Sequence, residues 1–224
     1  MRIAVLGTGM VGRALGTGLV RLGHEVRMGS RTAGNPVAAA WAEQLGPAAS
    51  AGDFAAAAAF GEVIVNATAG HACLAALRAA GADRLAGKVL VDVSNPLYAS
   101  GERWAGHSRS LAERIQRAFP EARVVKTLNT MSAAVMAEPS RVDGQHTVFL
   151  SGDDSRAKEV VAALLSDLGW TEESMIDLGG LGTARGTELL LPLGLDLWKA
   201  LGTANFNFHV QRPESTPFFP VSYS

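Results

Sequence analysis

Short, mostly apolar runs alternate along the chain with longer segments in which apolar residues recur every three or four positions. Runs of this length are typical of strands that are buried on both faces of a parallel sheet. We predict strands at Ile3–Leu6, Val26–Met28, Val63–Asn66, Val89–Val93 and Val124–Leu128. The intervening periodicity predicts helices at Met10–Leu22, Pro36–Leu45, Ala55–Ala59, Ala72–Ala80 and Ser110–Phe119. This alternation predicts an α/β fold with a Rossmann-like, doubly wound parallel sheet.

The same rhythm continues into the second half of the chain. A strand over Thr147–Leu150, a helix over Ser155–Leu168 and a strand over Met175–Leu178 extend the predicted sheet. Residues 1–178 are therefore expected to form one Rossmann-like domain. From Gly179 onward, glycine-rich turns, one apolar helix and an aromatic tail replace the alternation, which predicts a small C-terminal helical lobe over 179–224.

The predicted helix of this lobe, Thr187–Leu201, is apolar on nearly all sides. Such a helix needs burial on more than one side. A dimer interface, the wall of a second-substrate pocket and a core helix under the sheet each explain the pattern, and the sequence leaves the three open. Phe206 in the tail can cover a planar ring or pack against a second subunit. We expect a homodimer.

Composition narrows the range of partners. Lys and Arg total 20 against 21 Asp and Glu, a formal net charge of -1, so no global basic field attracts nucleic acid or an anionic membrane. The longest apolar stretches are shorter than a membrane span, and no secretory signal fits the N-terminus. A single cysteine, Cys73, excludes an intrachain disulfide and is typical of a reducing compartment. We expect a soluble cytoplasmic protein with neither nucleic acid nor membrane as a partner.

A glycine-rich turn joins the first predicted strand to the first predicted helix, with the sequence Gly7-Thr8-Gly9-Met10-Val11-Gly12. In this context Gly7 permits a tight turn, Gly9 lets the backbone approach a pyrophosphate, and Gly12 lets helix and strand pack closely. The helix N-terminus offers free N–H groups to the anion. The alternative is an ordinary strand-to-helix turn. The motif favours a dinucleotide site.

The end of the second predicted strand indicates which dinucleotide is bound. NAD-binding proteins place an acid about twenty residues past the glycines, on the ribose 2′-hydroxyl. Here the chain reads Ser30-Arg31-Thr32, without an acid. A serine hydroxyl and an arginine can hold a 2′-phosphate, so we predict that NADP is the cofactor. The alternative role for Arg31 is that of an ordinary surface arginine.

Several segments together resemble one family. The turn Gly7–Gly12, followed by Leu22–Val26 and Gly29–Arg31, is similar to the NADPH-dependent reductases of the deazaflavin coenzyme F420, and to the cytosolic reductase domain of transmembrane metalloreductases. Further similar segments follow in the same order over nearly the whole chain: Val91–Pro96, Val124–Ala133, Ser151–Asp154, Asp177–Gly179 and Thr183–Arg185.

The resemblance implies which residues contact NADP. At the pyrophosphate they are Thr8, Gly9, Met10 and Val11, and at the 2′-phosphate Ser30 and Arg31. Thr32 and Asn35 stand near the place of a family lysine and are predicted as neutral donors. The remaining contacts come from the ends of the later strands, where α/β sheets bind ligands, and we take them to be Ala67, Thr68, His71, Asn95, Pro96, Met131 and Ala133, with Phe206 from the tail.

Other polar residues have simpler explanations. His71 can contact the cofactor, or it can cap the following helix or face solvent. Asp153 and Asp154 directly precede the Ser155 helix and are predicted to cap it, and Ser110 with Glu113 fits a capping box. No histidine has ligand spacing with an acid or Cys73, so we predict no metal site.

The resemblance implies hydride transfer between NADPH and a small-molecule acceptor, F420. Because the two coenzymes carry the chemistry, no catalytic acid or base is assigned. Two alternatives stay open: an NADPH-dependent flavin or ferric reductase, and a non-catalytic NADP(H)-sensing module.

Overall fold

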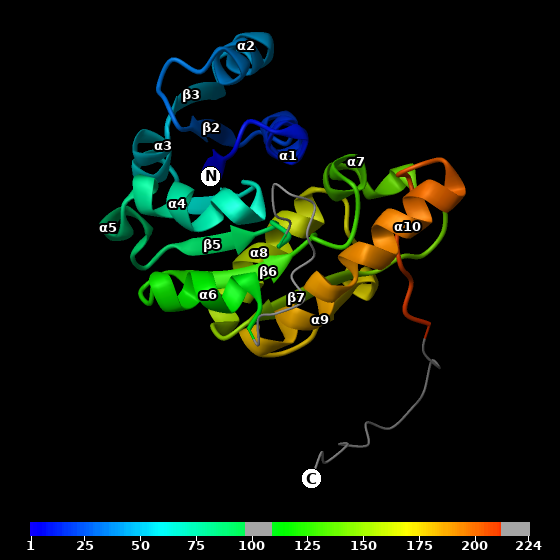
Figure 1. Cartoon of the computed structure of the whole chain (residues 1–224). Coiled ribbons are helices and arrows are strands. Elements are labelled where there is room, and N and C mark those ends of the chain that lie inside the picture. The colour runs from blue at the N-terminus through cyan, green and yellow to red at the C-terminus, as the bar shows by residue number, and fades with distance from the viewer. Residues whose placement is uncertain (97–108, 212–224) are drawn as a thin grey trace.

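The strands of the computed structural model, which describes residues 1–96 and 109–211, form one sheet. Within these residues it has eight strands in the order β3-β2-β1-β4-β5-β6-β7-β8 (Figure 1). Their bounds are β1 Arg2–Leu6, β2 Glu25–Ser30, β3 Ala49–Asp53, β4 Val63–Asn66, β5 Val89–Asp92, β6 Arg123–Thr127, β7 Val148–Gly152 and β8 Met175–Asp177. The first six strands are parallel, in the order that defines the Rossmann fold.

Helices cover both faces of the sheet. Residues of β1 alternate between the two faces: Ile3 and Val5 pack into one core, Ala4 and Leu6 into the other. The first core lies beneath α1 (Met10–Arg21), α2 (Pro36–Leu45), α7 (Ala133–Ala137) and α8 (Ser155–Asp167). The second lies beneath α3 (Phe54–Phe60), α4 (Gly70–Ala80), α5 (Ala82–Leu85), α6 (Leu111–Ala118) and α9 (Ala184–Leu189). The predicted doubly wound fold is confirmed.

Two features of the sheet differ from the prediction. Strand β3 was not expected, because Ala49–Asp53 contains no β-branched or aromatic residue. Within the described part of the chain it is an edge strand, paired with β2. Strand β7 runs antiparallel to β6. The described chain between these two strands contains the short α7 and a single 3-10 turn, and it leaves β6 and enters β7 at the same edge of the sheet.

The helix predicted over Thr187–Leu201 is two helices, α9 and α10 (Leu191–Leu201). Pro192 has no amide hydrogen and lies in the first turn of α10, a position that proline tolerates. Helix α9 enters the second core, whereas no residue of α10 is buried by the described chain. A core helix under the sheet is therefore the wrong explanation for α10, whereas it holds for the α9 part of this segment. Residues 212–224 of the predicted lobe lie outside the described residues.

The predicted caps are confirmed at two helix starts. Ser110 and Glu113 form the predicted capping box of α6, and the Asp154 carboxylate accepts the Ala157 amide at the start of α8. Asp153 has a different role from the one predicted. Its Oδ1 accepts the amide of Leu181 at 2.8 Å, so it anchors the turn that leads into α9.

Burial in the first core makes a test of the fold. Leu165 on α8 is 1% exposed, whereas Leu22 at the end of α1 is 46% exposed. We predict that Leu165→Ala lowers the free energy of unfolding by about 2–5 kcal/mol, because it removes packed methyl groups and leaves a cavity. The matched Leu22→Ala should cost about 1 kcal/mol or less, and urea unfolding measures both. Equal costs would contradict this assignment of the core.

Candidate active site

The parallel strands bring the predicted site residues to one edge of the sheet. Strands β1, β4, β5 and β6 lie side by side and end at the same edge, and β2 lies on the other side of β1. The strand order therefore reverses between β1 and β4, where ligands of open α/β sheets lie. Helix α1 begins at this point, and no side chain caps its N-terminus. An anion placed there meets the free amides of its first turn.

The three glycines of the turn have distinct environments. A Cβ at Gly7, whose φ is +121°, would lie 2.6 Å from the carbonyl oxygen of Ala67, and one at Gly12 would lie 2.0 Å from the carbonyl oxygen of Gly7. These glycines are needed for packing. Gly9 has ordinary φ, and a Cβ there would have no neighbour within 4 Å. The open space over Gly9 fits the pyrophosphate of a dinucleotide.

The loop after β2 presents the residues predicted for the 2′-phosphate. Arg31 and Thr32 are exposed. The Ser30 hydroxyl is buried and donates to the carbonyl oxygen of Thr32 at 2.5 Å, so it shapes the loop that carries Arg31. Asn35 caps α2, accepting the amides of Val37 and Ala38. Their contacts with NADP stay predictions, and Arg31 is the cation in this loop.

A pair of asparagines links the ends of β5 and β6. Asn95 Nδ2 donates to the carbonyl oxygen of Asn129 at 2.7 Å, and Asn129 Nδ2 donates back to Asn95 Oδ1 at 3.0 Å. Leu128, between β6 and Asn129, has a φ of 61°. A leucine in this region is strained, and such strain clusters at functional sites. Sequence analysis did not assign Asn129 to the site.

A pocket of about 130 Å³ lies between these asparagines and α10. Met131 and Phe206, both predicted from the sequence, line it together with Asn95. The other lining residues come from the loop after β6, from α10 and from the segment after it: Asn129, Thr130, Ser132, Leu191, Gly194, Leu195, Trp198 and Ala204. The pocket is thus mainly apolar, with a few amide and hydroxyl groups at the strand ends. An apolar lining with a few placed polar groups is the usual composition of a site for a small organic molecule.

The remaining predicted residues surround these features. Ala67 and Thr68 form the turn after β4 that packs on Gly7, and Pro96 follows Asn95. Ala133 is the first residue of α7. His71 is an exposed residue in the first turn of α4, and a Cβ at the preceding Gly70 would lie 2.0 Å from the Asn95 carbonyl oxygen, so α4 begins against the Asn95 loop.

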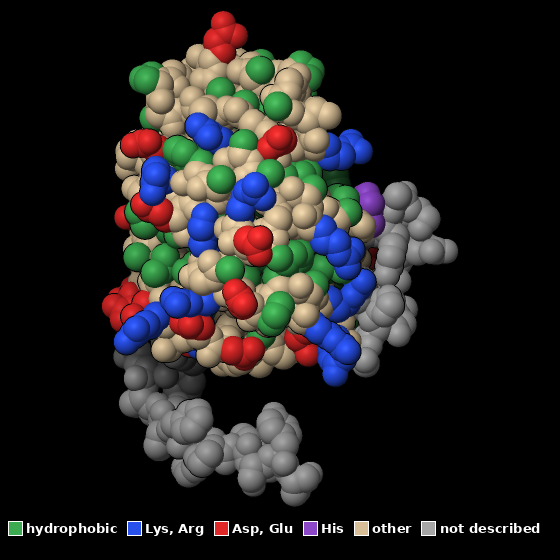
Figure 2. Space-filling view, turned by 90° about the vertical axis from the view of Figure 1, so that its left-hand side faces the viewer, with side chains coloured by type: hydrophobic (Ala, Val, Ile, Leu, Met, Phe, Trp, Pro, Cys, Tyr) green, Lys and Arg blue, Asp and Glu red, His purple; other side chains and the backbone are tan. Residues whose placement is uncertain are grey.

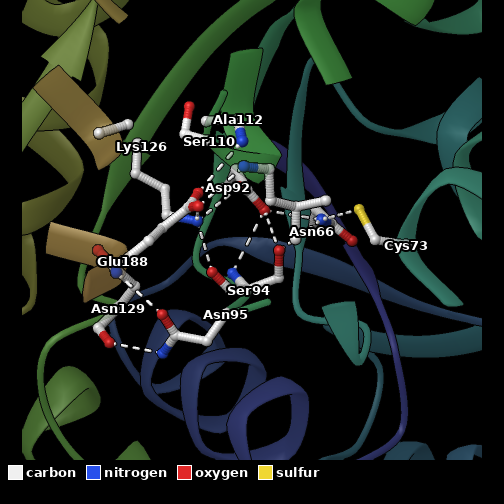
Figure 3. Close-up of polar contacts among 12 residues, drawn as sticks. Asn66, Cys73, Asp92, Ser94, Asn95, Ser110, Ala112, Lys126, Asn129 and Glu188 are labelled. Carbon is white, nitrogen blue, oxygen red and sulfur yellow. Dashed lines mark hydrogen bonds and ion pairs between the residues drawn. The ribbon is translucent and has the colours of Figure 1, made fainter. Parts of the chain in front are cut away.

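A buried polar cluster behind this edge was missed by sequence analysis (Figure 3). Lys126 Nζ lies 2.9 Å from Asp92 Oδ2 and 2.9 Å from Glu188 Oε1, and all three side chains are almost completely buried. Asp92 Oδ1 accepts Asn66 Nδ2 at 2.8 Å, and Asn66 Nδ2 also reaches the Cys73 sulfur at 2.9 Å. The only signal in the sequence was a Lys and an Asp inside otherwise apolar strands; Glu188 comes from the distant α9.

The cluster fixes the protonation of two of its members. Burial lowers the pKa of Lys126, but Asp92 and Glu188 together outweigh this effect and raise it above its usual value, so the ammonium stays charged. Burial raises the pKa of the Cys73 thiol to about 12, with the nearby Asp92 charge acting in the same direction. Cys73 is therefore a neutral thiol at physiological pH and not a nucleophile.

Two further findings concern the described residues alone. No group of three or more His, Cys, Asp or Glu side chains there is arranged to hold a metal ion. None of the helices there is both long and apolar enough to cross a bilayer.

A second hollow, of about 600 Å³, is larger than the pocket beneath α10 and lies beside β7. It is lined by residues that include Pro139, His146 and Trp170, and none of the residues predicted to bind NADP lines it.

Comparison with known proteins shows the family. Residues 2–96 match the family model described as NADP oxidoreductase, coenzyme F420-dependent. A crystal structure from Arthrobacter sp. FB24, provisionally named an F420-dependent NADP-reductase, is 50% identical and superposes with a TM-score of 0.86. The alignment covers 94% of this chain and 99% of that one. The chain belongs to the F420-dependent NADP oxidoreductase family. Membership supports NADP as the cofactor of the glycine turn.

The chain is also similar to proteins named metalloreductases. Metalloreductase STEAP3 of Rattus norvegicus is 36% identical over 203 residues, which cover 88% of this chain and 38% of the rat protein. The chain thus spans less than half the length of that relative. A reductive aminase from Aspergillus terreus, 22% identical over 89% of this chain and 62% of its own, has a TM-score of 0.63 and shows the fold alone.

Gly9 is open and Gly7 is tightly packed, and this difference provides a test of whether the turn binds the dinucleotide. We predict that Gly9→Val folds with nearly unchanged stability but weakens NADPH and NADH alike, by about tenfold or more, because the side chain fills the space for their shared pyrophosphate. Gly7→Val should instead lower the free energy of unfolding by about 1–3 kcal/mol. Titration calorimetry and urea unfolding separate the two effects. Wild-type affinity in Gly9→Val would mean that the turn is only structural.

Proposed function

We propose that this family member transfers a hydride between NADPH and a deazaflavin coenzyme of the F420 type. The observation that carries the proposal is the apolar pocket beside Asn95, Asn129 and Met131, which lies on the same sheet edge as the glycine turn. The 50% identity to the Arthrobacter protein, over nearly the full length of both chains, supports the choice of acceptor. The composition, with its single buried Cys73, is consistent with action in the cytoplasm.

In this proposal the residues of the chain bind and orient the two coenzymes. The first turn of α1 holds the pyrophosphate over Gly9, and Arg31 pairs with the 2′-phosphate. The nicotinamide end then follows the sheet edge past Ala67 and Thr68 to Asn95. When bound, the dihydronicotinamide supplies the hydride from its C4, and C5 of the deazaflavin accepts it.

The second ring would lie in the pocket beneath α10. Leu195, Trp198 and Phe206 form an apolar wall there, while Asn95 and Asn129 fix one another through paired hydrogen bonds. An apolar wall excludes water, and rigid strand ends hold the distance between the two rings. Because the two coenzymes would supply the chemistry, no residue of the chain is assigned as an acid or a base.

A specific observation favours one alternative. The similarity to the rat metalloreductase covers 88% of this chain, so an NADPH-dependent flavin or ferric reductase is the second candidate. A non-catalytic NADP(H)-sensing module is the third.

A panel of acceptors distinguishes these functions. NADPH oxidation by the purified protein is followed with F420, with a free flavin and with a ferric chelate, and the Gly9→Val variant is the control for cofactor-dependent turnover. The proposal expects turnover with F420 at least about tenfold faster than with the other acceptors. Preference for flavin or ferric chelate would support the second candidate, and binding of NADPH without any turnover would support the third.

The loop after β2 predicts the nucleotide preference. We expect NADPH to bind at least about tenfold more tightly than NADH, because Arg31 pairs with a phosphate that NADH lacks. Arg31→Ala should remove most of this preference and leave the NADH affinity unchanged, as measured by calorimetric titration. The matched control is Arg156→Ala, an exposed arginine at the start of α8 on the other edge of the sheet. Equal affinities for the two dinucleotides in the wild-type protein would refute the assignment.

We also propose that the protein is a homodimer that uses α10. Leu193 and Trp198 on this helix are 48% and 53% exposed, Leu201 at its end is 56% exposed, and Leu189 at the end of α9 is 57% exposed. An apolar surface of this kind marks association. On the side turned away from α10, charges of both signs are interspersed over the surface (Figure 2).

The dimer has its own test. Leu193 lies on α10 but does not line the pocket. We predict that Leu193→Asp sediments as a monomer, because a charge in an apolar interface is costly, while NADPH affinity is retained at the distant glycine turn. Analytical ultracentrifugation at micromolar concentration measures both proteins. A wild-type monomer, or a Leu193→Asp dimer, would contradict the proposal.

A further inference from the structure

We infer that Lys126, with Asp92 and Glu188, positions the loop that holds the nicotinamide against its acceptor. None of these three residues lines the pocket. They act instead through Ser94 and Asn66, their hydrogen-bonded neighbours at the strand ends (Figure 3). The inference rests on the proposed function, because it concerns the distance between the two rings.

Every hydrogen-bond donor of the Lys126 ammonium has a partner. Two are the carboxylates of Asp92 and Glu188, and the third is the main-chain carbonyl oxygen of Ser94. An ammonium has three donors, so this geometry uses all of them. Lys126 thus has one fixed position, and each acceptor is held relative to the other two.

The charges of the cluster are balanced by the main chain. One ammonium faces two carboxylates, which would leave a buried negative charge. Glu188, however, also accepts the amides of Leu111 and Ala112 at 2.8 and 3.2 Å, in the first turn of α6. The positive end of a helix stabilises a carboxylate placed there. Glu188 therefore connects α9 and α6 to the centre of the sheet.

Ser94 connects the cluster to the pocket. Its carbonyl oxygen accepts from Lys126, and its amide and hydroxyl donate to Asp92 Oδ1 at 3.2 and 2.6 Å. Every polar group of this residue is therefore tied to the cluster. The next residue, Asn95, lines the pocket and pairs with Asn129. A shift of the cluster would move Asn95 with it.

A second chain of hydrogen bonds connects the cluster to the turn after β4. Asn66 donates to Asp92, and its own Oδ1 accepts the hydroxyl of Thr68 at 2.7 Å. Thr68 follows Ala67, the residue that contacts the glycine turn. One carboxylate, Asp92, therefore orients both loops that flank the proposed path of the nicotinamide end.

The principal test uses Glu188→Gln, which keeps the shape of the side chain but removes its charge. An amide cannot accept from Lys126 and from both α6 amides as a carboxylate does, so the cluster must shift. The matched control is Lys88→Met: Lys88 donates to the carbonyl oxygens of Ala58 and Gly61 and precedes β5 at the opposite edge of the sheet. Ser94→Ala is a milder second variant, which removes one hydroxyl.

Three quantities are measured for each variant: NADPH affinity, the fluorescence of bound NADPH, and the single-turnover rate of acceptor reduction. We expect Glu188→Gln to keep its NADPH affinity within about threefold and to lose about tenfold to a hundredfold in rate, because a small misplacement of the rings is costly. Its bound-NADPH fluorescence should differ from that of the wild-type protein. Ser94→Ala should show the same changes at smaller size, and Lys88→Met neither.

Wild-type rate and fluorescence in both Glu188→Gln and Ser94→Ala would overturn the inference and leave the cluster a purely structural role. If Glu188→Gln does not fold, Ser94→Ala decides. If the wild-type protein reduces no deazaflavin, the proposed function fails, but the fluorescence of bound NADPH needs no acceptor and still tests the positioning.

Discussion

The two ion pairs that Lys126 makes, with Asp92 and with Glu188, are the constraint on which the rest of the structure depends. Burying three charges is costly, and a buried pair adds little net stability compared with apolar packing. The cluster instead fixes the positions of its residues, because each buried charge must keep its partners at ion-pair distance. The cluster thereby orders the loops after β4 and β5 and attaches α9, the first helix of the C-terminal segment, to α6 and the sheet (Figure 3).

The two halves of the candidate site are built by different means. At the glycine turn the site is formed by the backbone. Gly7 and Gly12 allow close packing, and Gly9 leaves open space beside the free amides of α1. At the pocket the site is formed by side chains, those of the Asn95–Asn129 pair and of the apolar residues of α10. The first half is common to dinucleotide-binding folds, whereas the second is where the proposed acceptor would lie.

Local signals in the sequence predicted most of the fold. The valine-rich runs, the capping box at Ser110 and the glycine turn each depend on neighbouring residues only, and all three were found correctly. Strand β3 was missed because Ala49–Asp53 has no strand-forming side chains and is ordered by its pairing with β2. The break between α9 and α10 was missed because the apolar pattern continues through Pro192.

The candidate site was predictable only in part, for a related reason. Met131 follows a recognisable strand end and Phe206 lies in an aromatic segment, so the sequence indicated these two residues of the pocket. Glu188 joins Lys126 across 62 positions, a pairing that no local pattern reveals. The Ser30 hydroxyl was expected to meet a phosphate, but it donates to the Thr32 carbonyl oxygen, and its contact with NADP stays a prediction.

The central claim is that both coenzymes meet at this sheet edge, with direct hydride transfer between them. The most direct measurement uses NADPH that carries deuterium on the transferred position of C4, with mass spectrometry of the reduced deazaflavin. The account predicts one deuterium on C5 of the product, with no exchange with water. Product that carries solvent hydrogen at C5, or deazaflavin left unreduced while NADPH is bound, would contradict it.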